Sequence, residues 1–408
     1  MSYRRRGLHL AIAAGILLGS TWTVAAPAHA EEACARGKTS YVPQRPDAFA
    51  QIGISQAWTL SHGDGVLVAV VDSGVEARND HLAAVVQPGV DLVGTGDGRT
   101  DTVGHGTAVA AIIAAQEVPG SGLVGVAPGV RIVPVRVYEQ TDPSKPNAPN
   151  VAKTAQGIVR AVDLGARIIA VPQSGETDTA ALSDAVRYAD AHGALVVASA
   201  GNAESGQAQN AVRYPANYPQ VLSVTAVDAT GTATDASEHG VHVKVAAPGQ
   251  NVLTAYFAEG DCVFAAQSTS TSYATGYVAG VAALAAAMHP EEKPADWQYR
   301  ILVTALRATA TLRDSSVGWG IVAPYAALNF VNDGSAAGPP NPRFATARER
   351  VDPVMVPPEG VPDESGPVRA AVAGIALVMG VLVVAGLLAV RIRAGRTKPV
   401  VREPARTR

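Results

Sequence analysis

Short apolar runs that alternate with helical patterns constrain this chain most strongly. Five runs are almost continuously apolar or β-branched, which is typical of strands buried on both faces of a sheet. Stretches of helical period lie between them. Such alternation predicts an α/β fold with a mostly parallel central sheet and helices on both faces. The expected strands cover residues 66–71, 131–137, 167–171, 194–198 and 221–227, and the expected helices cover 107–115, 152–164 and 179–192.

A further helix is expected over residues 272–288. This stretch is rich in Ala, Gly and Val and is apolar on every side, which indicates a helix that passes through the centre of the protein. Gly276 and Gly280 would let neighbouring elements pack closely against it. The domain built on this helix and the five strands is expected to extend over residues 51–331.

Three short segments place polar residues where the expected strands and helices end or begin. Asp72 ends the first strand in Val-Val-Asp-Ser-Gly, His105 lies at the mouth of a helix in Gly-His-Gly-Thr, and Ser272 starts the central helix in Ser-Thr-Ser-Tyr-Ala. Each alone has an ordinary explanation, as a turn former, a structural hydrogen-bonding group or a helix cap. Together, in the order Asp, His, Ser, they predict a serine peptidase. His105 would remove the proton of Ser272, and Asp72 would orient His105.

A fourth polar residue, Asn202, follows an expected strand in the segment Ala-Ser-Ala-Gly-Asn. An Asn after a Gly is ordinarily a turn residue, but beside a serine nucleophile its amide predicts one donor of an oxyanion hole. The backbone N–H of Ser272 is the other expected donor. Ser268 and Ser270 compete with Ser272 as nucleophile, yet only Ser272 precedes an aromatic-Ala step and then Val-Ala-Gly.

These segments resemble the subtilases, peptidase family S8, over about residues 53–328. Further points of resemblance are Gly-Val-Ala-Pro at 125–128, Tyr-Pro-Ala at 214–216, Ala-Ala-Pro-Gly at 246–249 and Gly-Trp-Gly at 318–320. Within the family, the chain is similar to the mycosins, membrane-anchored peptidases associated with type VII secretion in actinobacteria, through the stretches 57–60 and 132–137 and the order of its segments. The resemblance implies a subtilisin-like three-layer fold, a polypeptide substrate, and partners among the membrane components of a type VII secretion system.

Three positions depart from the family pattern. Ser270 stands where a Gly is usual, which matters if that position requires a positive φ. Gly276 replaces a Pro, and the substrate-binding segment, usually Asn-hydrophobic-Ser-Leu-Gly, reads Ala-Val-Pro-Gln-Ser over residues 170–174. Pro172 removes one backbone donor from the edge that should pair with substrate. We therefore expect an altered peptide groove, with narrow specificity or weak activity.

Both ends of the chain indicate export and membrane anchoring. Residues 1–30 combine three arginines, an apolar stretch and the ending Ala-His-Ala, which is typical of a cleaved secretory signal. Residues 370–390 carry no charge and are long enough to cross a bilayer once. Basic residues follow, so the positive-inside rule predicts a cytoplasmic tail at 391–408 and an extracytoplasmic catalytic domain at the cell membrane. Residues 31–50 are expected to form an N-terminal extension, and the Pro-rich segment 332–369 a linker.

Charge and cysteine content narrow the kinds of site to expect. The chain carries a net charge of −3, but its signal holds three arginines and its tail seven basic residues against one Glu, which leaves about −12 on residues 31–369. Nucleic acid is therefore not an expected partner. Cys34 and Cys262 both lie in the exported part, where a disulfide would persist; free or intermolecular thiols are the alternative. No cofactor or metal is expected, since acyl transfer needs none and no oxygen-rich loop is clear enough to assign calcium.

The sequence thus predicts a membrane-anchored serine endopeptidase. A different class of function stays open, in which a weakly active or degenerate protease domain serves as a structural subunit of a secretion membrane complex. The intact set Asp72, His105, Asn202 and Ser272 favours the enzyme, and the changed groove with Ser270 favours the scaffold.

Overall fold

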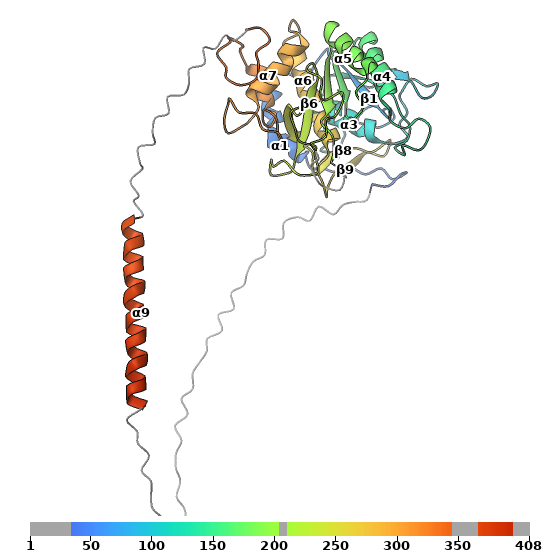
Figure 1. Cartoon of the computed structure of the whole chain (residues 1–408). Helices are drawn as coiled ribbons and strands as arrows, with labels where there is room; N and C mark the ends of the chain where they lie inside the picture. Colours follow the sequence, from blue (N-terminus) through green and yellow to red (C-terminus); the bar gives the residue numbers. More distant parts are fainter. Residues whose placement is uncertain (1–33, 204–209, 345–365, 395–408) are drawn as a thin grey trace, which may run out of the picture. The chain divides into compact units, whose positions relative to one another are not determined.

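The apolar runs form a seven-stranded sheet in which every pairing is parallel. The computed structural model describes residues 34–203, 210–344 and 366–394 (Figure 1). The strands occur in the order β2-β3-β1-β4-β5-β6-β7. Their bounds are β1 Leu67–Asp72, β2 Val90–Asp91, β3 Arg131–Arg136, β4 Ile168–Val171, β5 Leu195–Ser199, β6 Leu222–Val227 and β7 Val245–Pro248.

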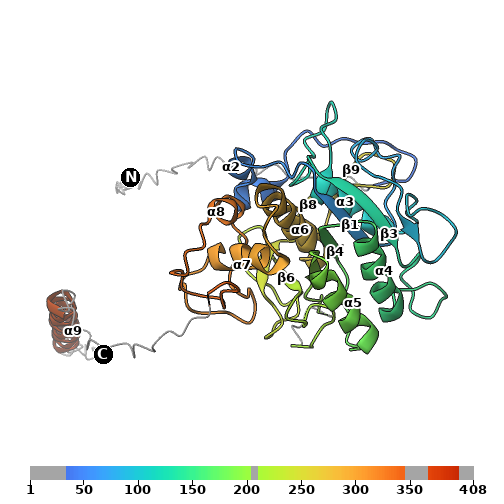
Figure 2. The ribbon, with the colours of Figure 1, turned by 90° about the horizontal axis from the view of Figure 1, so that it is seen from above.

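Alternate residues of the strands feed two separate cores, because successive side chains of a strand point to opposite faces. In β1, Val68 and Val70 join the core that contains α3 (His105–Ala114) and α6 (Thr271–Met288). Ala69 and Val71 join the core that contains α4 (Val151–Asp163) and α5 (Ala180–Ala191). Figure 2 shows the strands lying between these two pairs of helices. The expected three-layer α/β architecture is confirmed.

Helix α6 runs through the larger core and is buried along almost its whole length. Two glycines let its neighbours approach. A Cβ atom at Gly276 would lie 3.0 Å from Ile112 Cγ2 of α3, and one at Gly280 would lie 2.6 Å from Val126 Cβ. This close packing fixes the position of α6, and therefore of the residues at its start, relative to α3.

The predicted strands and helices agree with the observed ones to within one or two residues at each end. Several short elements were not predicted. They include the edge strands β2 and β7 and the antiparallel hairpin of β8 and β9. The remaining unpredicted elements are short helices. The bounds of the elements not yet given are β8 Val252–Ala255, β9 Asp261–Phe264, α1 Asp47–Ile52, α2 Ile54–Ala57, α7 Pro294–Thr304 and α8 Pro324–Asn329.

Residues 34–42 of the predicted N-terminal extension contact β9 and the turn before it. Cys34 and Cys262 form a disulfide, with 5.7 Å between their Cα atoms. The N–H of Asp261 donates to Ser40 O at 2.7 Å. The N–H of Val42 donates to Asp261 Oδ2 at 2.9 Å. The disulfide and several hydrogen bonds therefore hold this segment against the domain.

A buried hydrogen-bonded pair, His81 and Asp261, lies beside the same segment. His81 Nε2 is 2.8 Å from Asp261 Oδ1, and neither side chain is exposed to solvent. His81 Nδ1 is 2.6 Å from the carbonyl oxygen of Gln116. Asp261 thus links the N-terminal segment, β9 and the loop that carries His81.

The C-terminal part begins against the domain. In the first part of the predicted linker, Arg343 forms ion pairs with Asp296 at 2.7 Å and Glu292 at 3.1 Å. Helix α9 (Gly366–Ala394) belongs to a second compact unit. Its stretch Ala371–Ala389, with a mean hydropathy of 2.7, is long and apolar enough to cross a membrane. The predicted signal, most of the remaining linker and most of the predicted tail lie outside the described residues.

Candidate active site

Three neighbouring strands have their carboxyl ends at the same end of the sheet, and each of these ends leads to a residue of the candidate site. Asp72 is the last residue of β1, Pro172 follows β4, and Asn202 lies three residues beyond β5. Because β1, β4 and β5 are adjacent and parallel, their carboxyl ends lie side by side. His105 starts α3 and Ser272 is the second residue of α6. One cleft is lined by His105, Asn202 and Ser272, and Asp72 contacts the Nδ1 atom of His105.

Asp72 and His105 form a hydrogen-bonded pair. His105 Nδ1 lies 2.9 Å from each carboxylate oxygen of Asp72. The carboxylate is fully buried, whereas the imidazole side chain remains 24% exposed. Ser73 adds two donors to Asp72 Oδ1, its backbone N–H at 2.7 Å and its hydroxyl at 3.0 Å. Asp72 is thus fixed by its own strand while the other nitrogen of His105 stays available to the cleft.

The pair shifts the acidity of both partners. Burial alone would raise the pKa of Asp72, but His105 and the donors of Ser73 and Tyr138 outweigh burial and lower that pKa. Burial alone would lower the pKa of His105, but the Asp72 carboxylate, with a smaller contribution from Asp101, raises it above its ordinary value. An ionised carboxylate beside a basic imidazole is the arrangement that a general base requires.

Asp101 fixes the start of α3 and with it the backbone of His105. One of its carboxylate oxygens accepts from the N–H groups of Val103 at 2.9 Å and Gly104 at 2.8 Å. The other accepts from the N–H of Thr107 at 2.9 Å and from its hydroxyl at 2.7 Å. These bonds satisfy donors that have no partner inside the helix.

Ser272 is the second residue of α6, in the first turn, where the helix dipole is positive and its own N–H has no partner within the helix. Its hydroxyl donates to the carbonyl oxygen of Pro172 at 2.8 Å. The next residue, Tyr273, packs its ring against His105, with 5.9 Å between the ring centroids. Ser272 and His105 therefore face the same space, although the serine hydroxyl is bonded to a backbone carbonyl in this state.

The departure from the family pattern at Ser270 causes no backbone strain. Ser270 precedes α6 with φ −129° and ψ 121°, which is extended backbone that any residue adopts. A positive φ, the reason for which a Gly would be needed, does not occur at this position.

Two hydrogen bonds orient the side-chain amide of Asn202. The N–H of Thr271 at 2.9 Å and its hydroxyl at 2.8 Å both donate to Asn202 Oδ1. The Nδ2 donors of the amide are therefore left for the cleft. Gly201 precedes Asn202 with φ 109°, and a Cβ atom there would lie 2.8 Å from Arg213 Cγ. Only Gly suits this position, because of both its φ and its close neighbour.

The backbone of residues 172–175, which follow β4, is partly hydrogen-bonded within the protein itself. Pro172 has no N–H, as expected from the sequence, and its carbonyl is engaged by Ser272. Gly175 exchanges both backbone hydrogen bonds with Tyr214, at 3.0 and 2.7 Å. Within the described ranges, the backbone groups of residues 173–174 make no hydrogen bond to the rest of the chain. That short stretch is therefore what this edge offers to an extended peptide.

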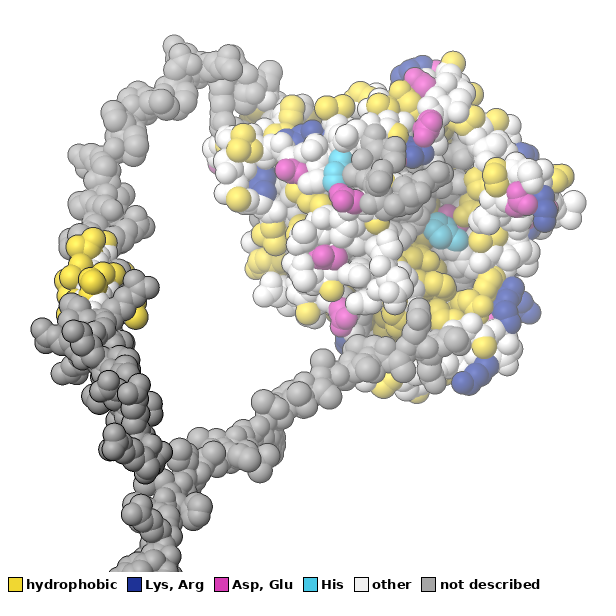
Figure 3. Space-filling view, turned by 60° about the horizontal axis from the view of Figure 1, so that its bottom comes forward, with side chains coloured by type: hydrophobic (Ala, Val, Ile, Leu, Met, Phe, Trp, Pro, Cys, Tyr) yellow, Lys and Arg dark blue, Asp and Glu magenta, His cyan; other side chains and the backbone are white. Residues whose placement is uncertain are grey.

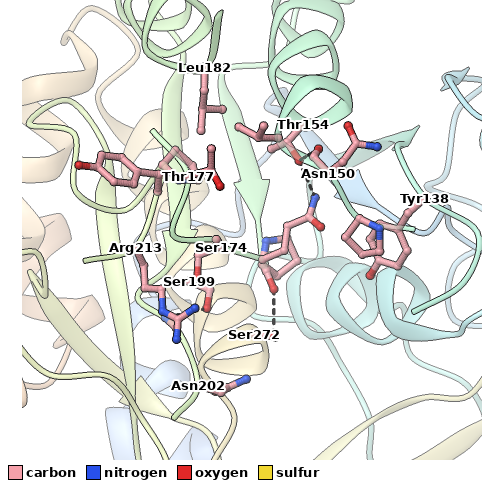
Figure 4. Close-up of a pocket in the computed structure, with 18 of the residues that line it drawn as sticks. Tyr138, Asn150, Thr154, Ser174, Thr177, Leu182, Ser199, Asn202, Arg213 and Ser272 are labelled. Carbon is pink, nitrogen blue, oxygen red and sulfur yellow. Dashed lines mark hydrogen bonds between the residues drawn. The ribbon is translucent and has the colours of Figure 1, made fainter. Parts of the chain in front are cut away.

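A cleft of about 740 Å³ opens over these residues. Figure 4 shows Asn202 and Arg213 on one side of Ser272 and Tyr138 on the other. Arg213 forms an ion pair with the buried Glu238 at 2.5 Å. The walls of the cleft combine polar and apolar side chains.

The sequence interpretation missed two side chains of this site. Tyr138 donates its hydroxyl to Asp72 Oδ1 at 2.8 Å. It follows β3 by two residues, and only the register between β1 and β3 brings it to Asp72. Asp101 could have been found, because an Asp shortly before an expected helix is a signal for a helix start. An aromatic residue after a strand carries no comparable signal.

Known proteins are similar to this chain in sequence and in structure. The sequence model of the subtilase family, Peptidase_S8, matches residues 63–320. Mycosin-1 of Mycobacterium tuberculosis (strain ATCC 25618 / H37Rv) is 33% identical over 391 residues, which cover 84% of this chain and 84% of that protein. The structure of the MycP3 protease from the type VII (ESX-3) secretion system is 33% identical, with a TM-score of 0.63, and the match covers 72% of this chain and 92% of MycP3.

A structure of MycP1 is described as that of a serine protease and an essential component of the type VII (ESX-1) secretion system. It is 29% identical to this chain with a TM-score of 0.61, over 71% of this chain and 90% of MycP1. The family match spans more than half of the chain and includes Asp72, His105, Asn202 and Ser272. The chain therefore belongs to the subtilase family of serine endopeptidases, and within that family it is similar to the mycosins.

Proposed function

We propose that this chain is a membrane-anchored serine endopeptidase that cleaves polypeptides outside the cytoplasmic membrane, in association with a type VII secretion system. The observation that carries the proposal is the Asp72–His105 pair, which faces the same cleft as Ser272 and Asn202. A buried carboxylate, a basic imidazole and a serine at a helix N-terminus are the groups that acyl transfer requires.

In the proposed reaction, Ser272 attacks the carbonyl carbon of the scissile peptide bond. Its hydroxyl leaves the Pro172 carbonyl and turns to His105 Nε2, which takes the proton as the new C–O bond forms. Asp72 stabilises the resulting imidazolium, which then gives the proton to the leaving amine. A water molecule, activated by His105 in the same way, hydrolyses the acyl-enzyme and restores the Ser272 hydroxyl.

The oxyanion of the tetrahedral intermediate would lie between two donors. One is the backbone N–H of Ser272, which the start of α6 leaves unpaired. The other is Asn202 Nδ2, whose direction is set by the two hydrogen bonds from Thr271. Both donors are held by the protein before substrate arrives, so they need little reorganisation during the reaction.

The position of the enzyme in the cell follows from the order of its segments. We propose a signal at 1–30, an extension at 31–50, a peptidase domain at 51–331, a linker at 332–369, a single span at 370–390 and a cytoplasmic tail at 391–408. The apolar stretch in α9 supports the anchor. The association with type VII secretion is supported by the similarity to MycP1 and MycP3, which are described as parts of such systems.

A polypeptide is the substrate class that the surface favours. On the face of the molecule in Figure 3, the acidic and basic side chains of the described residues are scattered rather than gathered into a basic tract. Nucleic-acid-binding proteins carry such a tract to neutralise phosphates. The backbone groups of residues 173–174 offer a short edge to an extended peptide.

A second candidate function is a structural subunit of the secretion complex with little or no catalysis. Two observations favour it. The Ser272 hydroxyl is bonded to Pro172 O. Gly175 pairs with Tyr214 and so shortens the edge available to substrate. Both features weaken substrate binding or activation, but neither removes a group that the reaction needs.

Covalent labelling of the full-length chain with a fluorophosphonate separates the two candidates. We expect labelling at Ser272 in membranes that contain the wild-type chain, and its loss in Ser272→Ala. Ser268→Ala is the matched control, since it removes a hydroxyl from the same loop and should leave labelling intact. If the folded wild-type chain neither takes the label nor cleaves any member of a broad peptide library, the scaffold function is supported instead.

A further inference from the structure

Tyr138 reaches the Asp72–His105 pair through the pairing of β1 with β3. In this parallel pairing Asp72 is level with Arg136, and the N–H of Val137 donates to Asp72 O at 2.8 Å. Tyr138 is the next residue, so its side chain starts at the height of the Asp72 carboxylate. The residue is buried, with only 4% of its surface exposed.

The Tyr138 hydroxyl contacts both members of the pair. Its oxygen lies 2.8 Å from Asp72 Oδ1 and 3.3 Å from His105 Nδ1. An ionised carboxylate only accepts hydrogen bonds, so the hydroxyl donates its proton to Asp72. The lone pairs of Tyr138 then face His105 Nδ1, where a proton is favourable and a second lone pair is not.

The donors around Asp72 are distributed unequally between its two oxygens. Oδ1 accepts from the N–H and the hydroxyl of Ser73 and from the hydroxyl of Tyr138, and it also lies 2.9 Å from His105 Nδ1. Among the described residues, only His105 contacts Oδ2. The three donors of Ser73 and Tyr138 therefore compensate the charge on Oδ1, whereas Oδ2 has no described hydrogen-bond partner besides the imidazole of His105.

We propose that Tyr138 is a positioning residue of the Asp72–His105 pair, which fixes the carboxylate and keeps the proton of neutral His105 on Nδ1. With the proton there, Nε2 is left unprotonated towards the cleft, where Ser272 lies. This inference rests on the proposed function, because it assigns Tyr138 a role through a base that acts on Ser272. The hydroxyl itself touches neither substrate nor Ser272.

Removal of the hydroxyl has a defined sign. Without the Tyr138 donor at 2.8 Å, the charge of Asp72 is less compensated and attracts the His105 imidazolium more strongly. This effect outweighs the loss of the longer contact, 3.3 Å, between the Tyr138 oxygen and His105 Nδ1, so the pKa of His105 rises. The titratable groups with which His105 interacts among the described residues are Asp72 on β1, Asp101 before α3, Tyr138 after β3 and Tyr273 on α6. Burial and Asp72 raise the pKa of Tyr138 well above 10, so the hydroxyl stays protonated over the pH range in which His105 titrates.

Proton NMR of the full-length chain in detergent micelles tests the role without substrate. The low-field resonance of His105 Nδ1–H, identified by its loss in His105→Ala, is titrated in the Ser272→Ala background. Tyr138→Phe should move the midpoint upward by about 0.5–1 pH unit. In the active chain, the acidic limb of kcat/KM should move in the same direction, with a loss at the plateau of less than about tenfold.

Tyr188→Phe is the matched control. It removes a Tyr hydroxyl that donates to Asp163 on the outer helices, at 3.1 Å, and should leave the midpoint unchanged. A midpoint in Tyr138→Phe that stays in place or falls overturns the role of Tyr138. If that variant does not fold, the wild-type chain provides the test. It must show a nuclear Overhauser effect between the Tyr138 hydroxyl proton and His105 Nδ1–H, and the absence of this effect also overturns the role. Neither result depends on turnover, so a failure of the proposed function is seen separately, as equal activity of wild type and Ser272→Ala.

Discussion

Single side chains at the cleft differ in how much each should contribute to turnover. Ser272→Ala should lower kcat by roughly 10⁴-fold or more, because the nucleophile and its base act as a unit. Asn202→Ala should lower it by about 10²–10³-fold, since the Ser272 N–H still faces the oxyanion. Thr271→Val keeps the shape of the side chain but removes one of the two donors to Asn202 Oδ1. It should lower kcat by less than either of the other two substitutions. Steady-state kinetics on one peptide checks this order, and a Thr271→Val loss equal to that of Asn202→Ala would count against Nδ2 as a donor.

The raised pKa of His105 sets the pH dependence of the proposed reaction. A general base must be neutral, so kcat/KM should rise with pH through the pKa of His105, which lies above the ordinary value of 6.5. The same shift stabilises the fold below pH 6.5, and that contribution is lost as pH rises through the folded-state pKa. The pH profile of kcat/KM measures the midpoint, and a midpoint below 6.5 would contradict the assignment. His192→Ala, at the exposed end of α5, should leave the profile unchanged.

Pro172 is the residue through which the groove departs most from the family pattern. Pro172→Ser restores a backbone N–H to the edge beside residues 173–174 and should lower KM for peptide substrates while changing kcat little. Pro149→Ser is the control, because Pro149 lines the same cleft but does not belong to this edge. Steady-state kinetics of both variants with an extended peptide measures the changes in KM and kcat. A gain confined to kcat would show that the ring of Pro172 acts on the chemical step and not on binding.

At the scale of elements, β9 depends on the buried pair between His81 and Asp261. Asp261→Asn replaces the buried carboxylate oxygen beside His81 Nε2 by a poorer acceptor, which should lower the free energy of unfolding by about 1–3 kcal/mol. Asp184→Asn breaks an exposed pair with Arg187 on α5 and should change it by less than about 1 kcal/mol. Denaturant unfolding of both variants measures the difference. Equal effects would mean that the buried contact between Asp261 and His81 does not stabilise the fold more than an exposed pair does.

Elements that could be predicted from the sequence share long apolar runs or a clear helical period. The strands β1, β3, β4, β5 and β6 and the helix α6 belong to this group. The edge strand β7 reads only Val-Ala-Ala-Pro, and the hairpin of β8 and β9 contains Asp261 and Cys262, whose places depend on the N-terminal segment. Such elements are defined by what packs against them rather than by their own pattern.

The same distinction holds for the site. Asp72, His105, Asn202 and Ser272 occur in short segments with specific neighbours, so the sequence marks them directly. Tyr138 has no such segment, because its contact with Asp72 comes from the register of two strands that are far apart in the chain. The bond between Ser272 and Pro172 O is likewise a property of the folded edge.

At the scale of the whole molecule, α9 decides where the peptidase works. If its apolar stretch spans the membrane with the basic tail inside, protease added to accessible intact cells should remove the domain and leave a small C-terminal stub in the membrane. Immunoblotting with antibodies against the tail and the domain follows both parts. Full protection of the domain, in cells whose other exported proteins are digested, would reverse the orientation proposed above.

The disulfide between Cys34 and Cys262 has a consequence for maturation. These residues are 228 positions apart, and the bridge joins the start of the described chain to β9. A cut anywhere between them, for example after Arg45, leaves the two fragments joined by this covalent bond. Trimming at such a point therefore cannot eject the N-terminal segment, and the nicked protein would migrate as one species until a reductant is added. In an oxidising compartment the segment is a permanent part of the enzyme rather than a removable leader.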